Sequence, residues 1–508
     1  MSNKDGNALL KKNALFTSSS FIFISAINFL TLPYIVSKMN IEVYGIYALL
    51  TGLFGFFGIF DFGMGQGLIK FVSEYHANDQ KDKISTAINS CLLFQLIVAA
   101  IVICLLYFFS EHIVKLFNVS EHNFDQSVNA FRIAMIGLFI SFISATFSSV
   151  LMGLQRYDLT SIVDSIGNVL LNLTLVGFLF YIHLSLSQAV LISVLYSLLI
   201  LFAYIILIMK KVTYYKPGLE FNVSIVKKFI RYSINIFLSK LSALFSTYLV
   251  RFFLAYFLTP AAVTLYVVPN KLLGAVGGVL SSGANSLFPF VSTLHARNDK
   301  DSIRQSYLKA ASIFAGIAIP SFLFIAFFSK PILTVWMGAD FADKTWLLLA
   351  IISISSLMAS ASTVPNLVIL GMGNSRLIAV FSIISICVYI ILVPWLTYSF
   401  GLIGCAAALL INSAVSIGIV FKYCLRYLSI SVSNFFKSTY NVHIIPVIIF
   451  SGISIGALSL LKLSSFSQLL SGVIVVSLYY LFLYLKLFRR NFETTIQKDI
   501  LTGTERIN

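Results

Sequence analysis

Hydrophobic residues along this 508-residue chain come in fourteen long runs that short polar segments separate. Each run can form a helix that crosses a bilayer, which takes about 20 residues. Runs such as LLFQLIVAAIVICLLYFF (92–109) do not alternate with polar positions and therefore do not predict β-barrel strands. The runs predict helical spans near residues 14–37, 44–72, 84–109, 127–153, 158–181, 187–209, 228–256, 261–292, 304–329, 345–371, 377–400, 402–424, 441–461 and 468–487.

An internal repeat relates the first six spans to the next six. FVSEYHANDQKDKI (71–84) matches FVSTLHARNDKDSI (290–303) at eight of fourteen positions, with an offset of 219 residues. A step of 218 aligns Gly153 in VLMGLQRYDL with Gly371 in VILGMGNSRL. Six spans are an even number, so both copies enter the membrane in the same orientation, as in transporters with parallel repeats.

The repeat predicts an all-α membrane protein of about fourteen transmembrane helices. Two parallel six-helix bundles should be related by a pseudo-two-fold axis along the membrane normal, followed by a C-terminal helix pair. The expected boundaries are 1–213 for the first bundle, 214–426 for the second, and 427–508 for helices 13 and 14 with a tail.

Charged residues orient the predicted spans. With a cytoplasmic N-terminus, 26 of the 35 Lys and Arg residues lie in cytoplasmic regions and 6 lie outside, as the positive-inside rule requires. Both termini are therefore predicted to be cytoplasmic. The net charge of +16 also fits a nucleic-acid-binding protein, but here the charges occupy short loops between apolar runs, and no nucleic-acid partner is expected.

Sequence signatures of an enzyme or a metal site are absent. The chain has no GxxxxGK[ST] loop, which an ATP-driven pump needs for its phosphates, and neither HExxH nor CxxC. Its six His and five Cys residues lack metal-ligand spacing. We therefore expect no catalytic residue, no metal and no cofactor, while a coupling ion, H⁺ or Na⁺, stays open.

The repeated segments also resemble a known family. The chain is similar to the polysaccharide flippases of the multidrug/oligosaccharidyl-lipid/polysaccharide exporter superfamily over about residues 10–425. The resembling stretches are LPYIVSKMNIEVYGIYALL (32–50), FDFGMGQGLIKFVSEY (60–75), LMGLQRYDL (151–159), VTLYVVPNKLLGAV (263–276), NSLFPFVSTLHARND (285–299) and LVILGMGNSRL (367–377). Many O-antigen flippases of this family resemble twelve-helix proteins, whereas residues 441–487 here add two helices, as in the lipid II flippases.

The resemblance implies a function and its partners. It implies a flippase in the inner (plasma) membrane that moves undecaprenyl-pyrophosphate-linked oligosaccharide from the cytoplasmic to the periplasmic leaflet, for O-antigen (lipopolysaccharide) or capsule biosynthesis. Membrane lipids are expected partners, and a polysaccharide polymerase and chain-length regulator are compatible with this function. A cation-coupled multidrug exporter of the same superfamily is the alternative. A membrane polymerase or ligase is less compatible, because it would carry a large periplasmic loop.

Ionisable residues within the spans are the candidate substrate-binding residues, because they are costly in a bilayer. Lys240 and Arg251 lie eleven residues apart on the seventh predicted span, which places them on one helix face. Lys271 occurs where the first repeat has Gly52. Such cations suit an anionic headgroup, although Lys240 and Arg251 could instead snorkel to the interfaces. Asp61 could pair with one of them, take part in ion coupling, or be solvated at the cytoplasmic end of its span.

Three residues in short cytoplasmic loops form a candidate gate. Arg156 and Asp158 lie between the fourth and fifth spans, and Arg376 lies in the matching loop of the second repeat. They could close the cytoplasmic mouth when the cavity faces out. They could equally be ordinary positive-inside residues with a neighbouring carboxylate.

Overall fold

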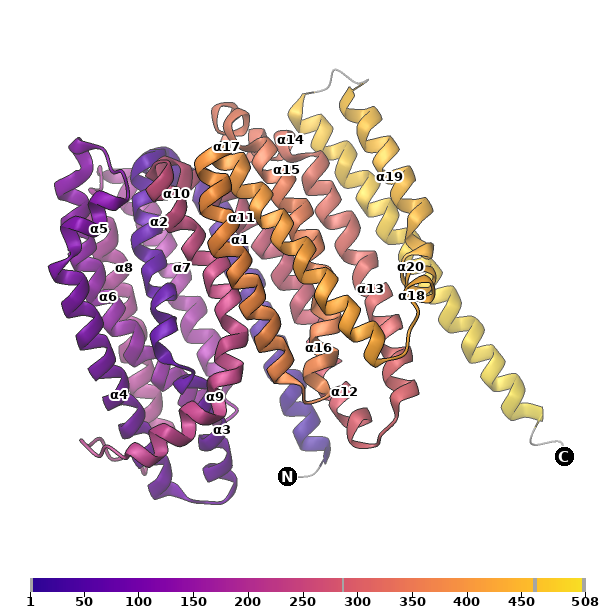
Figure 1. Cartoon of the computed structure of the whole chain (residues 1–508), viewed down its shortest axis with the longest axis horizontal. Coiled ribbons are helices and arrows are strands. Elements are labelled where there is room, and N and C mark those ends of the chain that lie inside the picture. The colour runs from indigo at the N-terminus through magenta and orange to yellow at the C-terminus, as the bar shows by residue number, and fades with distance from the viewer. Residues whose placement is uncertain (1–2, 286, 460–463, 505–508) are drawn as a thin grey trace. The chain divides into compact units, whose positions relative to one another are not determined.

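Helices form all of the regular structure in the described part of the chain (Figure 1). The computed structural model describes residues 3–285, 287–459 and 464–504. Within these ranges, eleven helices are long and apolar enough to cross a membrane. The predicted all-α membrane fold is thereby confirmed, while the number of fourteen spans stays a prediction.

The chain divides into two compact units, and the first comprises Met1–Asn285 and Met372–Ile419. Within it α1 packs against α7, α6 against α8, and α2 against α11. Its elements are α1 (Asn3–Met39), α2 (Ile41–Phe56), η1 (Phe57–Asp61), α3 (Met64–Ala77), α4 (Lys81–Phe108), α5 (Ser110–Leu116), α6 (Glu121–Gly153), α7 (Tyr157–Tyr181), α8 (Leu186–Lys211), α9 (Val223–Leu244), η2 (Phe245–Leu249), α10 (Val250–Phe257), α11 (Pro260–Ala284) and the first part of α17 (Ser375–Tyr427).

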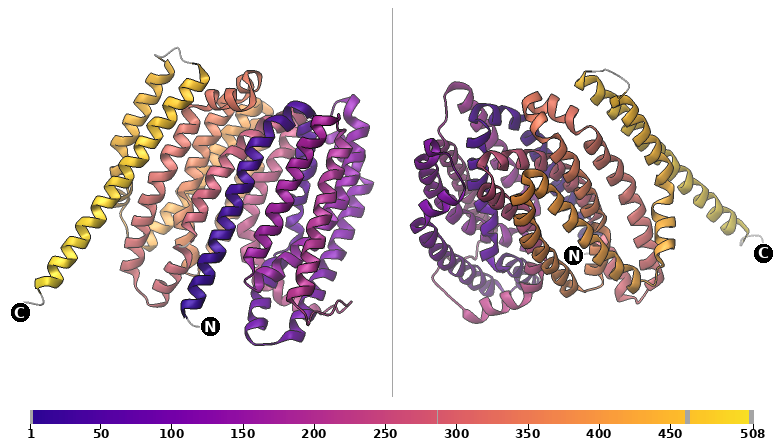
Figure 2. Two further views of the ribbon diagram at one scale, coloured as in Figure 1. Left: turned by 180° about the vertical axis from the view of Figure 1, so that it is seen from behind. Right: turned by 45° about the horizontal axis from the view of Figure 1, so that its top comes forward.

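The second unit comprises Ser286–Gly371 and Val420–Asn508. Within it α13 packs against α15, α12 against α16, and α19 lies beside α20 (Figure 2). His443 on α19 lies within hydrogen-bond distance of Tyr479 on α20 and of the Ser312 carbonyl on α13. The elements are α12 (Leu287–Ala296), α13 (Lys300–Phe327), α14 (Ser329–Met337), α15 (Ala339–Ala361), α16 (Thr363–Gly371), the end of α17, α18 (Val432–Thr439), α19 (Asn441–Ser459) and α20 (Ser465–Thr504).

Two predicted spans, 377–400 and 402–424, lie within α17. Its 53 residues would extend to about 80 Å as one straight helix, more than twice the hydrocarbon thickness of about 30 Å. The chain reverses at Gly401, whose φ of 60° and ψ of −141° are not helical (Figure 1). A Cβ on Gly404 would lie 1.8 Å from the Leu396 carbonyl oxygen, so the reversal depends on close backbone contact.

Another predicted span is interrupted within the described residues. Span 44–72 consists of α2, the 3₁₀ helix η1 and α3, with a break at Phe62 and Gly63, whose φ values are 49° and 79°. Span 261–292 consists of α11 and α12. Gly63 can adopt its positive φ without the strain of a side chain, which permits the interruption in the first repeat.

The repeated loops adopt the same backbone conformation in both units. Asp79 and Asn298, which are 219 residues apart, both have positive φ, of 53° and 56°. The amide of Asp79 donates to the His76 carbonyl, and the amide of Asn298 donates to the His295 carbonyl. In the second loop, hydrogen bonds from Ser302 lower the pKa of the Asp299 carboxyl, which caps α13. The repeat found in the sequence is thus a repeat of local structure.

The two aligned glycines make equivalent contacts. A Cβ on Gly153 would lie 2.9 Å from the Val72 Cβ, and one on Gly371 would lie 2.8 Å from the Val291 Cβ. Val72 and Val291 are again 219 residues apart. Each copy therefore uses a glycine at the end of one helix to admit the same valine of another.

Gly45 on α2 permits the closest approach of α2 to α11. A Cβ there would lie only 1.8 Å from the Pro260 carbonyl oxygen. We expect Gly45→Ala to force the helices apart and destabilise the protein by about 1–3 kcal/mol, the usual range for overpacking. Thermal unfolding of the detergent-solubilised protein measures this loss. Gly177→Ala is the matched control, because its Cβ would meet no atom within 4 Å, and equal unfolding temperatures for both variants would contradict the packing argument.

Candidate substrate-binding pocket

A polar pocket opens inside the first unit. It has a volume of about 310 Å³, near the lower end of the roughly 300–1,000 Å³ typical of small-molecule sites. Helices α1, α2, α7, α8, α10 and α11 line it. Its polar and charged lining residues are Asn28, Tyr44, Tyr47, Thr51, Asn168, Asn172, Ser193, Tyr196, Ser197, Arg251 and Lys271. No Asp or Glu occurs among the described lining residues.

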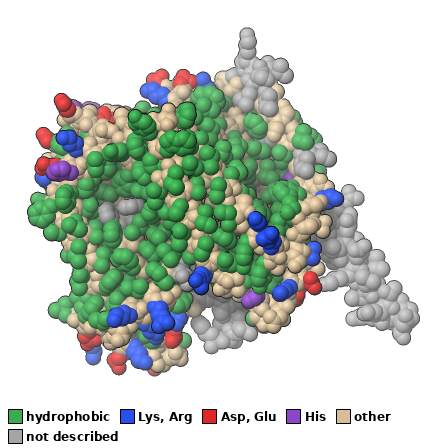
Figure 3. All heavy atoms as spheres, in the orientation of Figure 1, with side chains coloured by type: hydrophobic (Ala, Val, Ile, Leu, Met, Phe, Trp, Pro, Cys, Tyr) green, Lys and Arg blue, Asp and Glu red, His purple; other side chains and the backbone are tan. Residues whose placement is uncertain are grey.

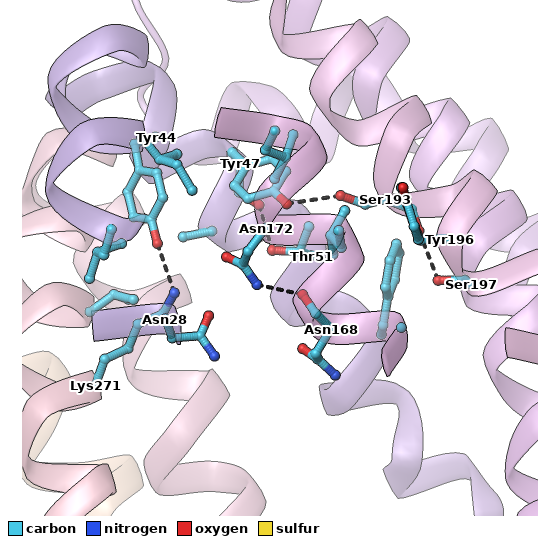
Figure 4. Close-up of a pocket in the computed structure, with 18 of the residues that line it drawn as sticks. Asn28, Tyr44, Tyr47, Thr51, Asn168, Asn172, Ser193, Tyr196, Ser197 and Lys271 are labelled. Atoms are coloured by element: carbon cyan, nitrogen blue, oxygen red, sulfur yellow. Dashed lines mark hydrogen bonds between the residues drawn. The ribbon is translucent and has the colours of Figure 1, made fainter. Parts of the chain in front are cut away.

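The structure brings two of the predicted cations, Arg251 and Lys271, into this one pocket. Lys271 on α11 is exposed, and its Nζ donates to the Tyr44 hydroxyl at 3.1 Å (Figure 4). The half-buried Arg251 on α10 donates through Nη1 to the Ala48 carbonyl at 3.3 Å. The Nε of Arg251 has no hydrogen-bond partner among the described residues. The pocket therefore offers donor capacity on the side formed by α10 and α11.

Gly52 on α2 makes room for the Arg251 guanidinium. A Cβ at this position would lie 3.0 Å from Nη1 of Arg251. With the offset of 219, Gly52 is the repeat counterpart of Lys271. The first repeat thus has no side chain where the second has a lysine, and the other cation of the pocket occupies the space.

Two tyrosines of α2 lie beside the cations. The rings of Tyr44 and Tyr47 are 6.0 Å apart, and Lys271 Nζ lies 5.8 Å from the centre of the Tyr44 ring. The hydroxyl of Tyr47 shares a 2.8 Å hydrogen bond with Ser193 on α8. Aromatic faces next to cations attract them and hold their positions.

Three asparagines form an amide wall on α1 and α7. The side-chain amides of Asn28, Asn168 and Asn172 each donate to the carbonyl four residues earlier in their own helix, at 2.8–3.1 Å. Figure 4 shows the bond from Asn172 to Asn168. Each such bond orients the amide so that its oxygen can accept a hydrogen bond. Thr51 and Ser197 satisfy their hydroxyl protons within their helices in the same way. The pocket therefore has a neutral polar side in addition to its cationic side.

Sequence reasoning missed these neutral residues. Asn, Ser, Thr and Tyr are common in spans, and only ionisable residues stood out as costly. A usable signal was their spacing. Asn168 and Asn172 are four residues apart, as are Ser193 and Ser197, so each pair shares one helix face.

Lys240 lies on α9, but its side chain is outside the described residues. The expectation that it shares a helix face with Arg251 assumed an unbroken α-helix. The π-helical segment η2 (Phe245–Leu249) interrupts the span between them and changes the angular register. Its proposed contact with substrate stays a prediction.

Asp61 lies at the end of η1 and does not line the pocket. Its carboxylate accepts a 2.7 Å hydrogen bond from Gln95 on α4 and two bonds of 3.2 Å from the Gly65 amide. Gln95 in turn accepts a hydrogen bond from Thr146 on α6. Asp61 thus belongs to a polar chain inside the helix bundle, at a different place from the two cations.

Arg156 and Asp158 form an ion pair at the start of α7. Arg156 donates through Nε and Nη2 to the two carboxylate oxygens of Asp158, at 2.9 and 3.1 Å. Arg376 is exposed near the start of α17. A closed bidentate pair can hold the α6–α7 turn without a gating role, so the gate of Arg156, Asp158 and Arg376 stays a prediction.

The sequence matches the family described as "Polysaccharide biosynthesis protein" over residues 10–295, more than half of the chain. The matched region contributes all of the pocket residues named above. It also includes the first repeat and the start of the second.

A Shigella flexneri protein that is named a putative O-antigen transporter is one relative. It is 21% identical over 402 residues, which cover 78% of this chain and 93% of that protein. The chain therefore aligns with nearly the full length of this relative.

Two solved structures share the fold. The lipid II flippase MurJ in an inward closed conformation superposes with a TM-score of 0.71 and 16% identity, covering 95% of this chain and all of that one. An inward-facing multidrug resistance MATE transporter of the MOP superfamily gives a TM-score of 0.62 and 15% identity, covering 82% of this chain and 94% of that one. The described helices therefore share the fold of these two transporters.

Proposed function

Because this chain belongs to the polysaccharide biosynthesis protein family, we propose that it is a flippase for lipid-linked oligosaccharides. It would carry undecaprenyl-pyrophosphate-linked repeat units to the outer leaflet of the plasma membrane for O-antigen or capsule synthesis. The observation that carries this proposal is the pocket that holds Arg251 and Lys271 without a lining carboxylate among the described residues. Such a pocket favours an anionic group over a cationic one.

The two sides of the pocket suit two parts of one substrate. Lys271 and Arg251 would hold the pyrophosphate, with the unpartnered Nε of Arg251 as an additional donor. The amide wall of Asn28, Asn168 and Asn172 would accept hydrogen bonds from sugar hydroxyls. A volume of about 310 Å³ accommodates only a segment of such a substrate, so the lipid and the outer sugars would extend beyond it.

Transport in this proposal needs no chemical step and no bound cofactor. Alternating access between two bundles would move the headgroup, as in transporters built from parallel repeats. A gradient of H⁺ or Na⁺ would supply energy, and Asp61 is a carboxylate outside the pocket that such an ion could engage. A polysaccharide polymerase and a chain-length regulator would receive the product.

A multidrug exporter is the less supported alternative. A site for cationic drugs should contain a carboxylate, whereas the charged residues that line this pocket are both cations. The likeness to the lipid II flippase also covers 95% of the chain, compared with 82% for the multidrug transporter.

Gene deletion and complementation test the proposal. Cells that lack the protein should accumulate lipid-linked repeat units on the cytoplasmic leaflet and lose surface polymer, and the intact gene should restore display. Normal surface polymer in the deletion strain, in the absence of a second flippase, would contradict the proposal. Restoration of drug resistance without polymer would favour the alternative.

The proposed topology places both chain ends in the cytoplasm. Periplasmic reporter fusions after residues 120, 335 and 464 should be active, and cytoplasmic reporter fusions after residues 80, 215, 300 and 500 should be active, because Lys and Arg concentrate in the latter loops. A periplasmic signal after residue 500 would mean an odd number of spans and would contradict the arrangement.

A further inference from the structure

A short strap, residues 212–222, joins α8 to α9 and lies along the first turns of α4. The side-chain amide of Asn89 donates to the Lys216 carbonyl at 3.0 Å, and the backbone N–H of Asn222 donates to Ser90 Oγ at 3.0 Å. Asn89 and Ser90 are buried, so the backbone of the strap satisfies polar groups that the helix bundle would otherwise leave open. The strap is therefore held in a defined conformation.

Large apolar side chains are exposed at the end of the strap. Val212 and Tyr215 at the start of the strap are buried, whereas Glu220 near its end is exposed and accepts a 3.1 Å hydrogen bond from Thr86 on α4. The apolar residues on either side point outward. Leu219 is 87% exposed, Phe221 45% and Val223, the first residue of α9, 50%. In a loop surrounded by water, three such exposed apolar side chains within five residues would be unfavourable.

The position of the strap along α4 explains why its apolar side chains are exposed. Residues 85–90 of α4, which the strap contacts, fall inside the predicted span 84–109. The strap thus lies at the boundary between hydrocarbon and water, where an outward-facing Leu219 or Phe221 can enter the bilayer. Amphipathic segments that bind membranes from one side bury apolar side chains in this way.

The strap and its flanks are also strongly basic. Residues 210–231 contain six Lys or Arg residues and one Glu. Lys228 packs on the Phe71 ring of α3, at 4.2 Å from the ring centre. The other five are exposed and form no ion pair in the described part of the chain: Lys210, Lys211, Lys216, Lys227 and Arg231. Figure 3 shows Lys and Arg side chains gathered over the lower ends of α4 and α9.

We propose that the strap and the first turns of α9 form a binding surface for anionic phospholipid headgroups of the cytoplasmic leaflet. Leu219 and Phe221 enter the leaflet, and the exposed lysines and Arg231 contact the lipid phosphates. Each basic residue near an anionic surface raises affinity by about fivefold. The surface holds the α8–α9 connection at the membrane and enriches anionic lipid beside α4 and α9. This inference does not depend on the transported substrate.

Fluorescence quenching by brominated lipids tests the proposal in the full-length protein. A tryptophan is introduced by Leu219→Trp, and the signal of the unsubstituted protein is subtracted. Two sets of vesicles have the same composition, an equal mixture of phosphatidylcholine and phosphatidylglycerol, but only one of the two lipids is brominated in each set. Leu199→Trp is the matched control, because Leu199 is an exposed residue of α8 within the predicted span 187–209.

Brominated phosphatidylglycerol should quench the fluorescence of the Leu219→Trp protein at least about twofold more strongly than brominated phosphatidylcholine, because the strap and the first turns of α9 carry several exposed cations. The control should show nearly equal quenching. Combined Lys216→Gln, Lys227→Gln and Arg231→Gln substitutions in the Leu219→Trp protein should reduce the ratio to the control value.

Three results would each overturn the proposal: equal quenching by the two lipids in both proteins, no quenching of the Leu219→Trp protein by either lipid, or an unchanged ratio after charge removal. Because the readout requires no transport, a failed flippase assay would leave the inference intact.

Discussion

Lys271→Ala is expected to lower surface polymer display by about ten- to a hundredfold while the protein remains at normal abundance in the membrane. A charge-assisted hydrogen bond to phosphate contributes about 1.5–3 kcal/mol, which corresponds to that range. Lys271 is exposed in the pocket and donates to the Tyr44 hydroxyl, so its removal leaves no buried charge behind. Surface polymer per unit of membrane protein is the quantity to measure.

Two variants separate charge from structure in this experiment. Lys271→Arg should keep much of the activity, because either cation can neutralise a phosphate. Lys309→Ala removes an exposed lysine of α13 that does not line the pocket, and should leave display unchanged. Normal display in the Lys240→Ala, Lys271→Ala double variant would contradict the cationic pocket, and the lysines would then serve only to reach the interface.

Arg251→Met should reduce transport by a similar factor of about ten to a hundred, for a different reason. Methionine keeps much of the length and apolar packing of the side chain, but it removes the guanidinium that fills the space beside Gly52. Arg251→Lys should be more active than Arg251→Met but less active than the unsubstituted protein. A guanidinium can bind a phosphate through two nitrogens at once, whereas a lysine has only one. Transport rates in vesicles, normalised to folded protein, measure both effects.

The matched control for Arg251 is Arg132. The half-buried Arg132 forms an ion pair with the exposed Glu111 at 3.0 Å, away from the pocket. Such surface pairs contribute about 0.2–1 kcal/mol, so Arg132→Met should retain near-normal transport. If Arg132→Met and Arg251→Met were equally impaired, loss of any membrane-edge arginine would explain the result and the assignment of Arg251 would be wrong.

The sequence was informative about the repeat because the repeat includes charged loops. Apolar runs match one another by chance, but the HAxxxKD pattern does not, and the structure gives Asp79 and Asn298 the same left-handed conformation. Breaks within the spans were harder to place. A 3₁₀ or π turn requires no particular residue, so FGIFD in η1 and FSTYL in η2 did not mark a break in the sequence.

The candidate site could be predicted only in part. Arg251 and Lys271 stood out because a charge in a span is costly, and the structure places both in one pocket. The neutral side of that pocket forms where α1, α7 and α8 pack near α2. Residue spacing within one helix does not predict which helices pack together. Asp61 was grouped with the cations because it is also a charged residue within a span. Its carboxylate instead accepts hydrogen bonds from Gln95 and Gly65, outside the pocket.

Flipping by the purified protein tests the central claim most directly. Proteoliposomes would contain undecaprenyl-pyrophosphate-linked oligosaccharide with a fluorophore on its sugar, and a reagent that cannot cross the membrane would bleach the outer leaflet. The account predicts that the intact protein exposes the inner-leaflet pool to the reagent and that Lys271→Ala, Arg251→Met protein does so at least about tenfold more slowly. No acceleration over protein-free vesicles by the folded protein, together with uptake of a cationic drug, would contradict it.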